Sequence, residues 1–214
     1  MAAKNDIIEP RIHAGKRRLE QAVDKQPAAP YKPTREQLLA SAGKTISDVI
    51  APDLRVLFCG INPGLYSGWT GHHFARPGNR FWPALHASGF THRLLAPAEK
   101  RELLKDGYGI TNVIARTTAS ETDLRKDEYA IGARRLRTKL RRYQPKFLAV
   151  LGIGAYRVAF DKPRAILGRQ EEKICDTIVW VLPNPSGLNA HYQPKELARL
   201  FRELRQAVEI EYDV

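Results

Sequence analysis

The chain has 214 residues, with 35 lysine and arginine residues against 23 aspartate and glutamate residues and a formal net charge of +12. This length allows one ordinary domain with a substantial core, and the charge favours a polyanionic partner without specifying a fold. Two cysteines, Cys59 and Cys175, are too few for a disulfide framework or a cysteine-only metal site. Without a signal-like or membrane-length apolar run, we expect a cytoplasmic protein that is neither exported nor inserted in a membrane.

Residues 1–33 differ in composition from the rest of the chain. They hold seven basic and four acidic residues and a proline-punctuated stretch that ends at Pro33. This composition predicts a basic tail and linker, partly helical or partly disordered, ahead of a single domain over residues 34–214. Thr34 and Gln37 have the spacing of a capping box, which predicts a short helix directly after the linker.

Strand and helix patterns alternate through the predicted domain. Helical periodicity is found in residues 79–88, 97–104 and 126–143, the last with one apolar stripe before Pro145. Short apolar runs bounded by Gly, Pro or Asp occur at residues 55–59, 109–114, 147–151 and 177–182. This alternation predicts an α/β fold, in which a central, mostly parallel sheet is flanked by helices on both faces.

Three polar segments leave the carboxyl ends of predicted strands: residues 60–64, 112–123 and 183–189. Ligands of open α/β sheets bind beyond these ends, so we expect the segments to meet at one rim and form the binding site.

Individual residues of these segments each admit two interpretations. Asn62 lies in a Pro-Gly turn, and its amide either orients a water or polar ring or only closes an Asx turn. Phe74 offers either a stacking surface for a planar ligand or a core side chain. Leu188, raised by a Pro-Ser-Gly run, either folds into the core or forms an exposed wedge that separates stacked bases.

Four ordered motifs carry a family resemblance: residues 60–64 (GINPG), 79–82 (NRFW), 109–118 (GITN and RTT) and 184–188 (NPSGL). Together they resemble the mismatch-specific uracil-DNA glycosylase and thymine-DNA glycosylase branch of the uracil-DNA glycosylase superfamily. The resemblance runs from about residue 54 to 207 and leaves out the N-terminal tail. It implies the three-layer sandwich of that superfamily and an enzyme that needs neither metal nor organic cofactor.

The resemblance also implies roles for residues of the predicted pocket. Asn62 would position the attacking water, and Phe74 would stack on the flipped base. Backbone amides near Ile61 and Phe74 would bind the pyrimidine edge, Ser67 would lie beside C5 of the ring, and Asn112 would belong to the base-binding residues.

In the last segment, Leu188 resembles the wedge that fills the gap in the base stack. Gly187, Asn189 and His191 would lie beside the orphaned guanine. Because an amide is a weak proton acceptor, a carboxylate would help catalysis. Asp123 follows the third motif and is either an auxiliary base or cation stabiliser, or a helix N-cap ahead of residues 125–143.

Three other patterns give weaker signals. The adjacent His72 and His73 point to different sides and have no third ligand at matching spacing, so we predict no metal site. Residues 151–154 imitate a dinucleotide-binding glycine motif but lack its third glycine. Six basic residues within 134–142 either contact phosphates or form a solvated helix face.

We therefore predict a monomeric, monofunctional DNA glycosylase that flips uracil from double-stranded DNA, especially from G·U mismatches, and hydrolyses its N-glycosidic bond. Thymine and modified pyrimidines are further candidate substrates. One alternative is a non-catalytic DNA mismatch or lesion binder. Another is an enzyme of free nucleotides, which would need the phosphate-binding glycines and carboxylate pair that this sequence lacks.

Overall fold

The computed structural model describes residues 32–212, so the tail predicted for residues 1–33 lies outside the described residues except for its last two. The described chain forms a five-stranded sheet of order β2-β1-β3-β5-β4. Its strands are β1 (Val56–Gly60), β2 (Tyr108–Asn112), β3 (Phe147–Leu151), β4 (Gly168–Arg169) and β5 (Ile178–Leu182). Only the short edge strand β4 pairs in antiparallel fashion, which confirms the predicted, mostly parallel sheet.

The helices that the sequence predicted are present in the expected order, together with four further ones. Those that the sequence predicted are α1 (Arg35–Leu39), α3 (Phe81–Ala87), the 3-10 helix η1 (Pro97–Asp106) and α4 (Lys126–Tyr143). The capping box of Thr34 and Gln37 is present at α1. Two helices that were not predicted are α2 (Leu65–Thr70), inside the glycine-rich segment, and the C-terminal α6 (Pro194–Tyr212). The remaining elements are η2 (Glu121–Asp123) and α5 (Ile153–Phe160).

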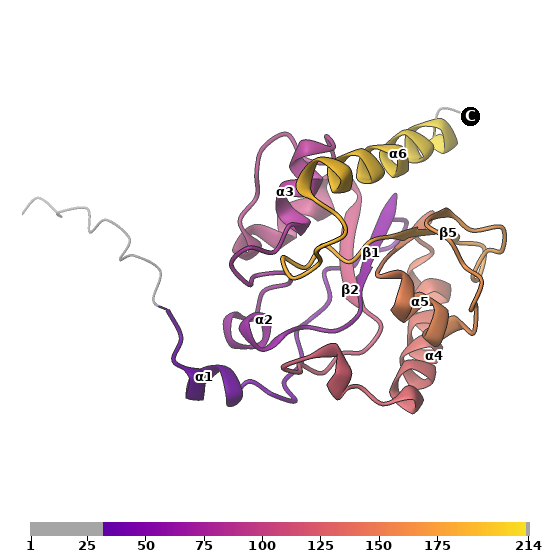
Figure 1. Cartoon of the computed structure of the whole chain (residues 1–214). Coiled ribbons are helices and arrows are strands. Elements are labelled where there is room, and N and C mark those ends of the chain that lie inside the picture. Colours follow the sequence, from indigo (N-terminus) through magenta and orange to yellow (C-terminus); the bar gives the residue numbers. More distant parts are fainter. Residues whose placement is uncertain (1–31, 213–214) are drawn as a thin grey trace, which may run out of the picture. The chain divides into compact units, whose positions relative to one another are not determined.

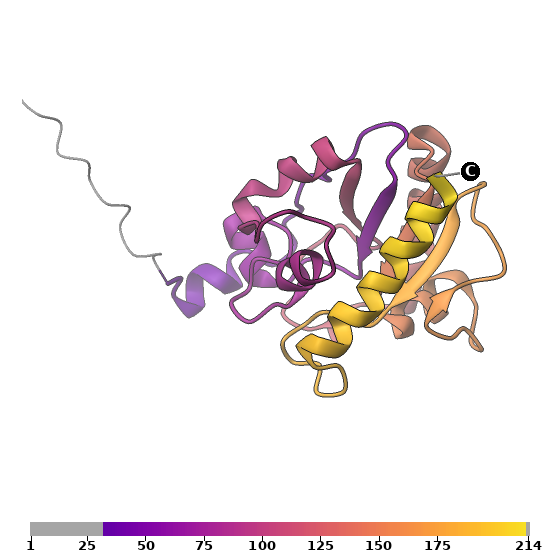
Figure 2. The same ribbon diagram turned by 90° about the horizontal axis from the view of Figure 1, so that it is seen from above.

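Alternating side chains of the strands build two separate cores, one on each face of the sheet. In β1, Val56 and Phe58 belong to one core, whereas Leu57 and Cys59 belong to the other. The first core contains side chains of α3, η1 and α6, and the second contains those of α4 and α5. Figures 1 and 2 show α6 on one side of the strands and α4 with α5 on the other. This is the expected three-layer arrangement, and a strand buried on both faces explains the continuous apolar runs.

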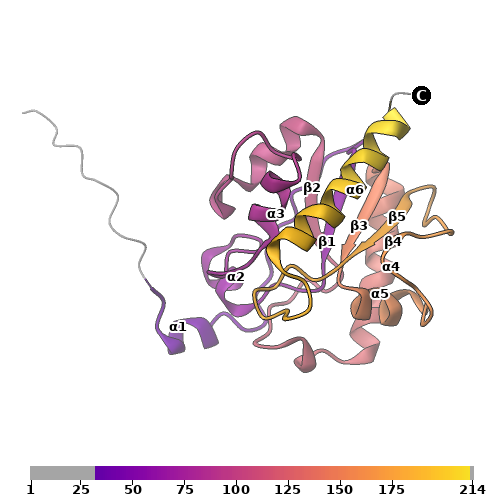
Figure 3. The same cartoon turned by 45° about the horizontal axis from the view of Figure 1, so that its top comes forward.

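All four parallel strands end at the same rim, because their carboxyl ends are in register. Gly60 pairs with Asn112, and Leu151 pairs with Leu182. The turns that follow these strands therefore emerge side by side, with the loop before α6 next to the region of α2 (Figure 3). Within residues 32–212, no helix combines the length and the apolar character needed to cross a membrane.

Candidate active site

The three polar segments meet in one cavity of about 430 Å³ at this rim. Its lining is mixed polar and aromatic and includes seven of the residues singled out from the sequence: Ile61, Asn62, Ser67, Phe74, Asn112, Leu188 and Asn189. The structure thus gathers side chains that lie up to 128 positions apart in the chain. A larger groove of about 560 Å³ near α5 and β4 contains none of them.

Asn62 is held with its amide nitrogen toward the protein. Its Nδ2 donates to the Thr118 hydroxyl at 2.7 Å and to the Arg116 carbonyl at 3.3 Å. Thr118 in turn donates to the Ser120 carbonyl at 2.7 Å, so its oxygen is left to accept from Asn62. Within the described chain, no hydrogen bond is made to Asn62 Oδ1. The amide therefore offers an acceptor to a water in the cavity.

The backbone that carries these partners is anchored by an ion pair between the loop before α4 and the first turn of α4. Arg116 Nε lies 2.6 Å from Glu128 Oε1, and the guanidinium also donates to the Asp123 carbonyl at 3.0 Å. The hydrogen bond from Arg116 lowers the pKa of Glu128 to about 2, so the pair stays charged at neutral pH. This loop thereby fixes the carbonyl and hydroxyl that hold Asn62.

Phe74 forms an aromatic floor backed by the core. Its ring stacks on Phe81 with centroids 4.1 Å apart and an interplanar angle of 29°, and Phe81 is fully buried. Phe74 itself is partly exposed and lines the cavity. Its backbone has a positive φ of 54°, which is uncommon for an aromatic residue and indicates that surrounding packing holds it. One ring face is thus available for stacking.

Asn112 lies at the end of β2 and is fixed by a buried histidine. Its Nδ2 lies 3.3 Å from His73 Nδ1, and His73 Nε2 lies 3.0 Å from the Ser47 carbonyl. Burial lowers the pKa of His73 to about 4, so the ring is neutral at physiological pH. A Cβ placed on Gly60 would lie 2.5 Å from Asn112 Oδ1 and 3.2 Å from the Phe74 ring. Gly60 therefore provides the space in which this oxygen and this ring lie together.

Ile61 and Ser67 complete the inner lining. Both are buried, and Ser67 Oγ accepts from the Ala75 amide at 3.3 Å, which ties α2 to the segment after Phe74. Ile61 follows β1, and its carbonyl accepts from the Ile114 amide at 2.9 Å.

Leu188 is the most exposed large apolar side chain in the described chain, with 74% of its surface accessible. Its loop is held from below by Arg80, whose guanidinium donates to the carbonyls of Asn189 at 3.0 Å and Tyr192 at 2.6 Å. A longer contact of 3.4 Å reaches the Gly187 carbonyl. The leucine therefore projects from a loop whose backbone is fixed, and it does not fold into the core.

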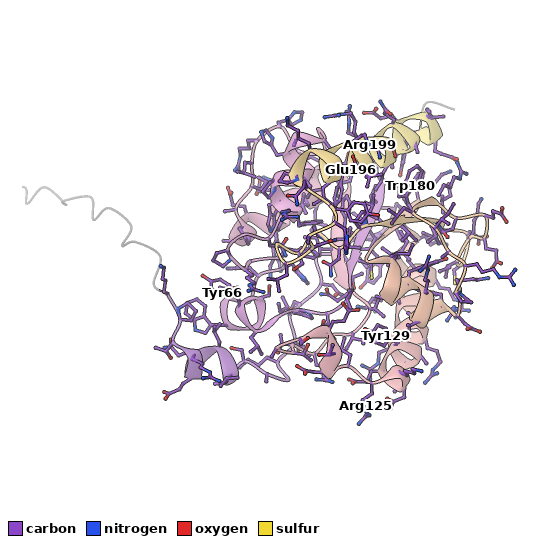
Figure 4. The ribbon with its side chains drawn as sticks, in the orientation of Figure 1. Tyr66, Arg125, Tyr129, Trp180, Glu196 and Arg199 are labelled. Carbon is purple, nitrogen blue, oxygen red and sulfur yellow. The ribbon has the colours of Figure 1, made fainter. Side chains whose placement is uncertain are left out.

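Asp123 does not line the cavity. It is exposed, and its Oδ2 accepts from the Ser120 amide at 3.0 Å in the capping box of η2. Asp123 therefore takes part in the cap of η2. It does not cap α4, whose N-cap residue is Arg125. The carboxylate in the cavity lining is that of Glu121, which accepts from the Tyr129 hydroxyl at 3.2 Å. Figure 4 shows Tyr129 near Arg125 at the start of α4, on the other side of the molecule from Glu196 and Arg199.

Three further groups lie outside the cavity lining. Gly187 and His191 belong to the Leu188 loop, but they are exposed and do not line the cavity. None of the basic residues within 134–142 lines the cavity, and Lys139 is paired with Asp48 at 2.5 Å. In residues 32–212 no group of three or more His, Cys, Asp or Glu residues is arranged to hold a metal ion.

The sequence did not predict the residues that orient the candidate site residues. Thr118 and Arg80 belong to motifs of the family resemblance, and His73 belongs to a histidine pair, but none of the three has a local signal for this role. Each acts on a residue at least 39 positions away, so no local pattern signals it.

Comparisons with known proteins identify the family to which the sequence is similar. The sequence profile of the Uracil DNA glycosylase superfamily matches residues 47–205, which include every residue of the cavity lining. A solution NMR structure of a candidate uracil DNA glycosylase from Methanosarcina acetivorans is similar at 18% sequence identity and a TM-score of 0.49. The match covers 76% of this chain and 98% of that chain.

Proposed function

Because this chain belongs to the uracil DNA glycosylase superfamily, whose members are DNA glycosylases, we propose that it hydrolyses the N-glycosidic bond of uracil flipped out of double-stranded DNA. The observation that carries the proposal is the joint placement of Asn62, Phe74 and Leu188 around one cavity. An acceptor for water, a stacking surface and an exposed apolar tip are the three groups that such a reaction needs.

The chemistry follows from the orientation of the Asn62 amide. A water that donates to Oδ1 is held against the sugar, and its oxygen adds to C1′ as the bond to N1 of the base breaks. The bond electrons leave with the pyrimidine, and the proton of the water passes to solvent or to the departing base. Positioned water supplies proximity, and polar groups around the base stabilise its developing negative charge.

The reaction proposed is monofunctional, without a covalent enzyme–sugar intermediate. A lyase step would need an amine or thiol nucleophile at the sugar. The cavity lining within the described residues contains no lysine and no cysteine. Cys59 lies beneath it in β1, where burial raises the pKa of the thiol to about 12.

A preference for uracil opposite guanine is the finer part of the proposal. Extruding a base costs a few kcal/mol and costs least at a mismatch. We propose that Leu188 fills the gap that the base leaves. Gly187, Asn189 and His191 belong to the same loop, and the family resemblance suggests them as contacts of the orphaned guanine. Thymine requires room for its methyl group near Ser67.

The test is single-turnover release of uracil from a G·U duplex, read as strand cleavage after alkali. We expect release by the wild-type protein and a loss of about 100-fold or more in Asn62→Ala, with duplex binding retained. A wild-type protein that binds the duplex but releases no uracil would instead support the non-catalytic binder. Equal release by both proteins would remove Asn62 from the mechanism.

A further inference from the structure

Two asparagines of the cavity lining, Asn62 and Asn112, are oriented by different partners. Of these two side chains, only the Asn112 amide depends on a titratable ring. Asn62 donates to oxygen atoms that can accept a hydrogen bond whatever the pH. Asn112 donates to an imidazole nitrogen, which accepts only when it carries no proton. The state of His73 therefore decides which end of the Asn112 amide faces the cavity.

The tautomer of His73 follows from its two neighbours. The Ser47 carbonyl, 3.0 Å from Nε2, can only accept, so Nε2 carries the proton of the neutral ring. Nδ1 is then bare and must accept. The Asn112 amide meets it with NH₂ and leaves Oδ1 on the Gly60 side, within the cavity lining.

Because His73 and Asn112 are both buried, turning the Asn112 amide over would be energetically unfavourable. His73 is 2% exposed and Asn112 is 8% exposed. Turning the amide over would set its oxygen against the bare Nδ1 of His73, so that two acceptors would face each other away from water. A buried polar group left without its hydrogen-bond partner is unfavourable because it has lost its contacts with water. The order of donor and acceptor on the amide edge is thus fixed before any base enters.

A fixed amide edge distinguishes pyrimidines by their own edges. Uracil and thymine carry a hydrogen on N3 beside the O4 acceptor, whereas cytosine has a bare N3 beside its amino donor. An inward-facing Oδ1 accepts the N3 hydrogen of uracil but opposes the lone pair of cytosine. The reversed amide would suit cytosine instead.

Resting on the proposed glycosylase function, we propose that His73 is a positioning residue which, by fixing the Asn112 amide, selects pyrimidines that carry a hydrogen on N3. His73 is 2% exposed in the cavity lining, and the role proposed for it is exercised through the Asn112 amide. The substrate class is thereby uracil and its 5-substituted relatives, with cytosine rejected at the floor of the cavity.

The experiment compares the binding of uracil and cytosine without competition from base pairing. Duplexes carry 2′-fluoro-2′-deoxyuridine or 2′-fluoro-2′-deoxycytidine, which resist hydrolysis, opposite a tetrahydrofuran abasic analogue. For the wild-type full chain we expect at least about tenfold tighter binding of the uracil duplex, and for His73→Phe a ratio of about two. A ratio in His73→Phe equal to that of the wild type overturns the proposal.

The adjacent histidine supplies the matched control. His72 is of the same residue type, does not line the cavity, and within the described residues its Nδ1 has no hydrogen-bond partner. His72→Phe is expected to keep the wild-type ratio. A merely structural role of His73 would weaken both duplexes alike and leave the ratio unchanged.

A second measurement does not depend on the folding of a variant. In the ¹⁵N-labelled wild-type chain, the ring nitrogens of His73 should show a protonated Nε2 and a bare Nδ1 at pH 7. The opposite tautomer overturns the proposal. If the wild-type protein releases no uracil from G·U duplexes, the proposed glycosylase function is wrong. If it releases uracil but His73→Phe keeps the wild-type ratio of uracil to cytosine affinity, only the role of His73 is wrong.

Discussion

The floor of the cavity and the loop that carries Leu188 face the same space but are stabilised by different means. The floor is buried, and its groups are fixed by side-chain contacts: Phe74 on Phe81, and Asn112 on His73. The Leu188 loop is exposed, and it is held by the Arg80 guanidinium on its backbone carbonyls together with hydrogen bonds within the loop. Under the proposed function, the floor would distinguish bases and the loop would open the duplex, so substitutions in the two regions should have different effects.

The largest loss of uracil release is expected when an added side chain fills the floor of the cavity. A methyl group on Gly60 would lie 2.5 Å from Asn112 Oδ1 and 3.2 Å from the Phe74 ring, so Gly60→Ala forces both out of place. We expect single-turnover uracil release to fall by about 100-fold or more on single-stranded and duplex DNA alike. Gly154→Ala, where a Cβ meets nothing within 4 Å, is the control. A loss confined to duplex DNA would contradict this assignment.

Acid should lower the free energy of unfolding through the protonation of His73. Its pKa falls from the ordinary 6.5 to about 4, chiefly by burial, with Lys100, Asp48 and Lys139 as the charged groups that act on it. Between these pH values the unfolded chain binds a proton here and the folded chain does not, so the free energy of unfolding falls as pH falls. At pH 5 the loss from this residue is about 2 kcal/mol relative to neutral pH.

Urea unfolding at pH 7 and pH 5 measures this loss. His73→Phe should be less stable than the wild type at pH 7 but should lose about 2 kcal/mol less on acidification. Identical pH dependence in the two proteins would show that His73 is not a buried neutral histidine.

Releasing the loop should have a smaller and more selective effect. Arg80→Met keeps an unbranched apolar stem but removes the donors to the carbonyls of Asn189 and Tyr192. We expect release from a G·U duplex to fall about tenfold, with less than about twofold change on a flexible single strand, because only the duplex must be opened.

Arg202→Met is a matched control for this variant. Arg202 also donates to a backbone carbonyl, but that carbonyl belongs to Ala87 in α3, at 3.0 Å, and not to the Leu188 loop. Equal losses on duplex and single strand in Arg80→Met would indicate that Arg80 supports the floor as well.

The smallest effect is expected for Asp123→Asn. Its carboxylate already accepts from the Ser120 amide at 3.0 Å and lies outside the cavity lining, and an asparagine retains an acceptor for that bond. Release should change by less than about threefold, whereas an auxiliary base would cost about 100-fold. Single-turnover rates measured from pH 5 to 9 separate these outcomes.

The order of strands and helices could be predicted because its signals are local. The apolar run at residues 147–151 and the helix over residues 126–143 match β3 and α4 residue for residue. Missed elements also have local reasons. α2 contains Gly68 and is capped by Gly64 and Gly71, so its composition resembles a loop.

The candidate site could be predicted in outline. The rule that parallel strands end at one rim brought Asn62, Asn112 and Leu188 to one place, because register follows from strand pairing. Asp123 was assigned from its position in the chain, and a turn of η2 directs its carboxylate to a backbone amide instead.

The sequence by itself determined the parallel sheet, its two covered faces and the segments that meet at its rim, since apolar periodicity and turn residues act over a few positions. Only the tertiary structure decided how the groups at that rim are oriented. Thr118 turns the amide of Asn62 from 56 positions away, His73 turns that of Asn112 from 39, and Arg80 holds the carbonyl of Tyr192 from 112. Such orientations depend on hydrogen bonds between distant segments, and these form only when the folded chain brings donor and acceptor within about 3 Å of each other.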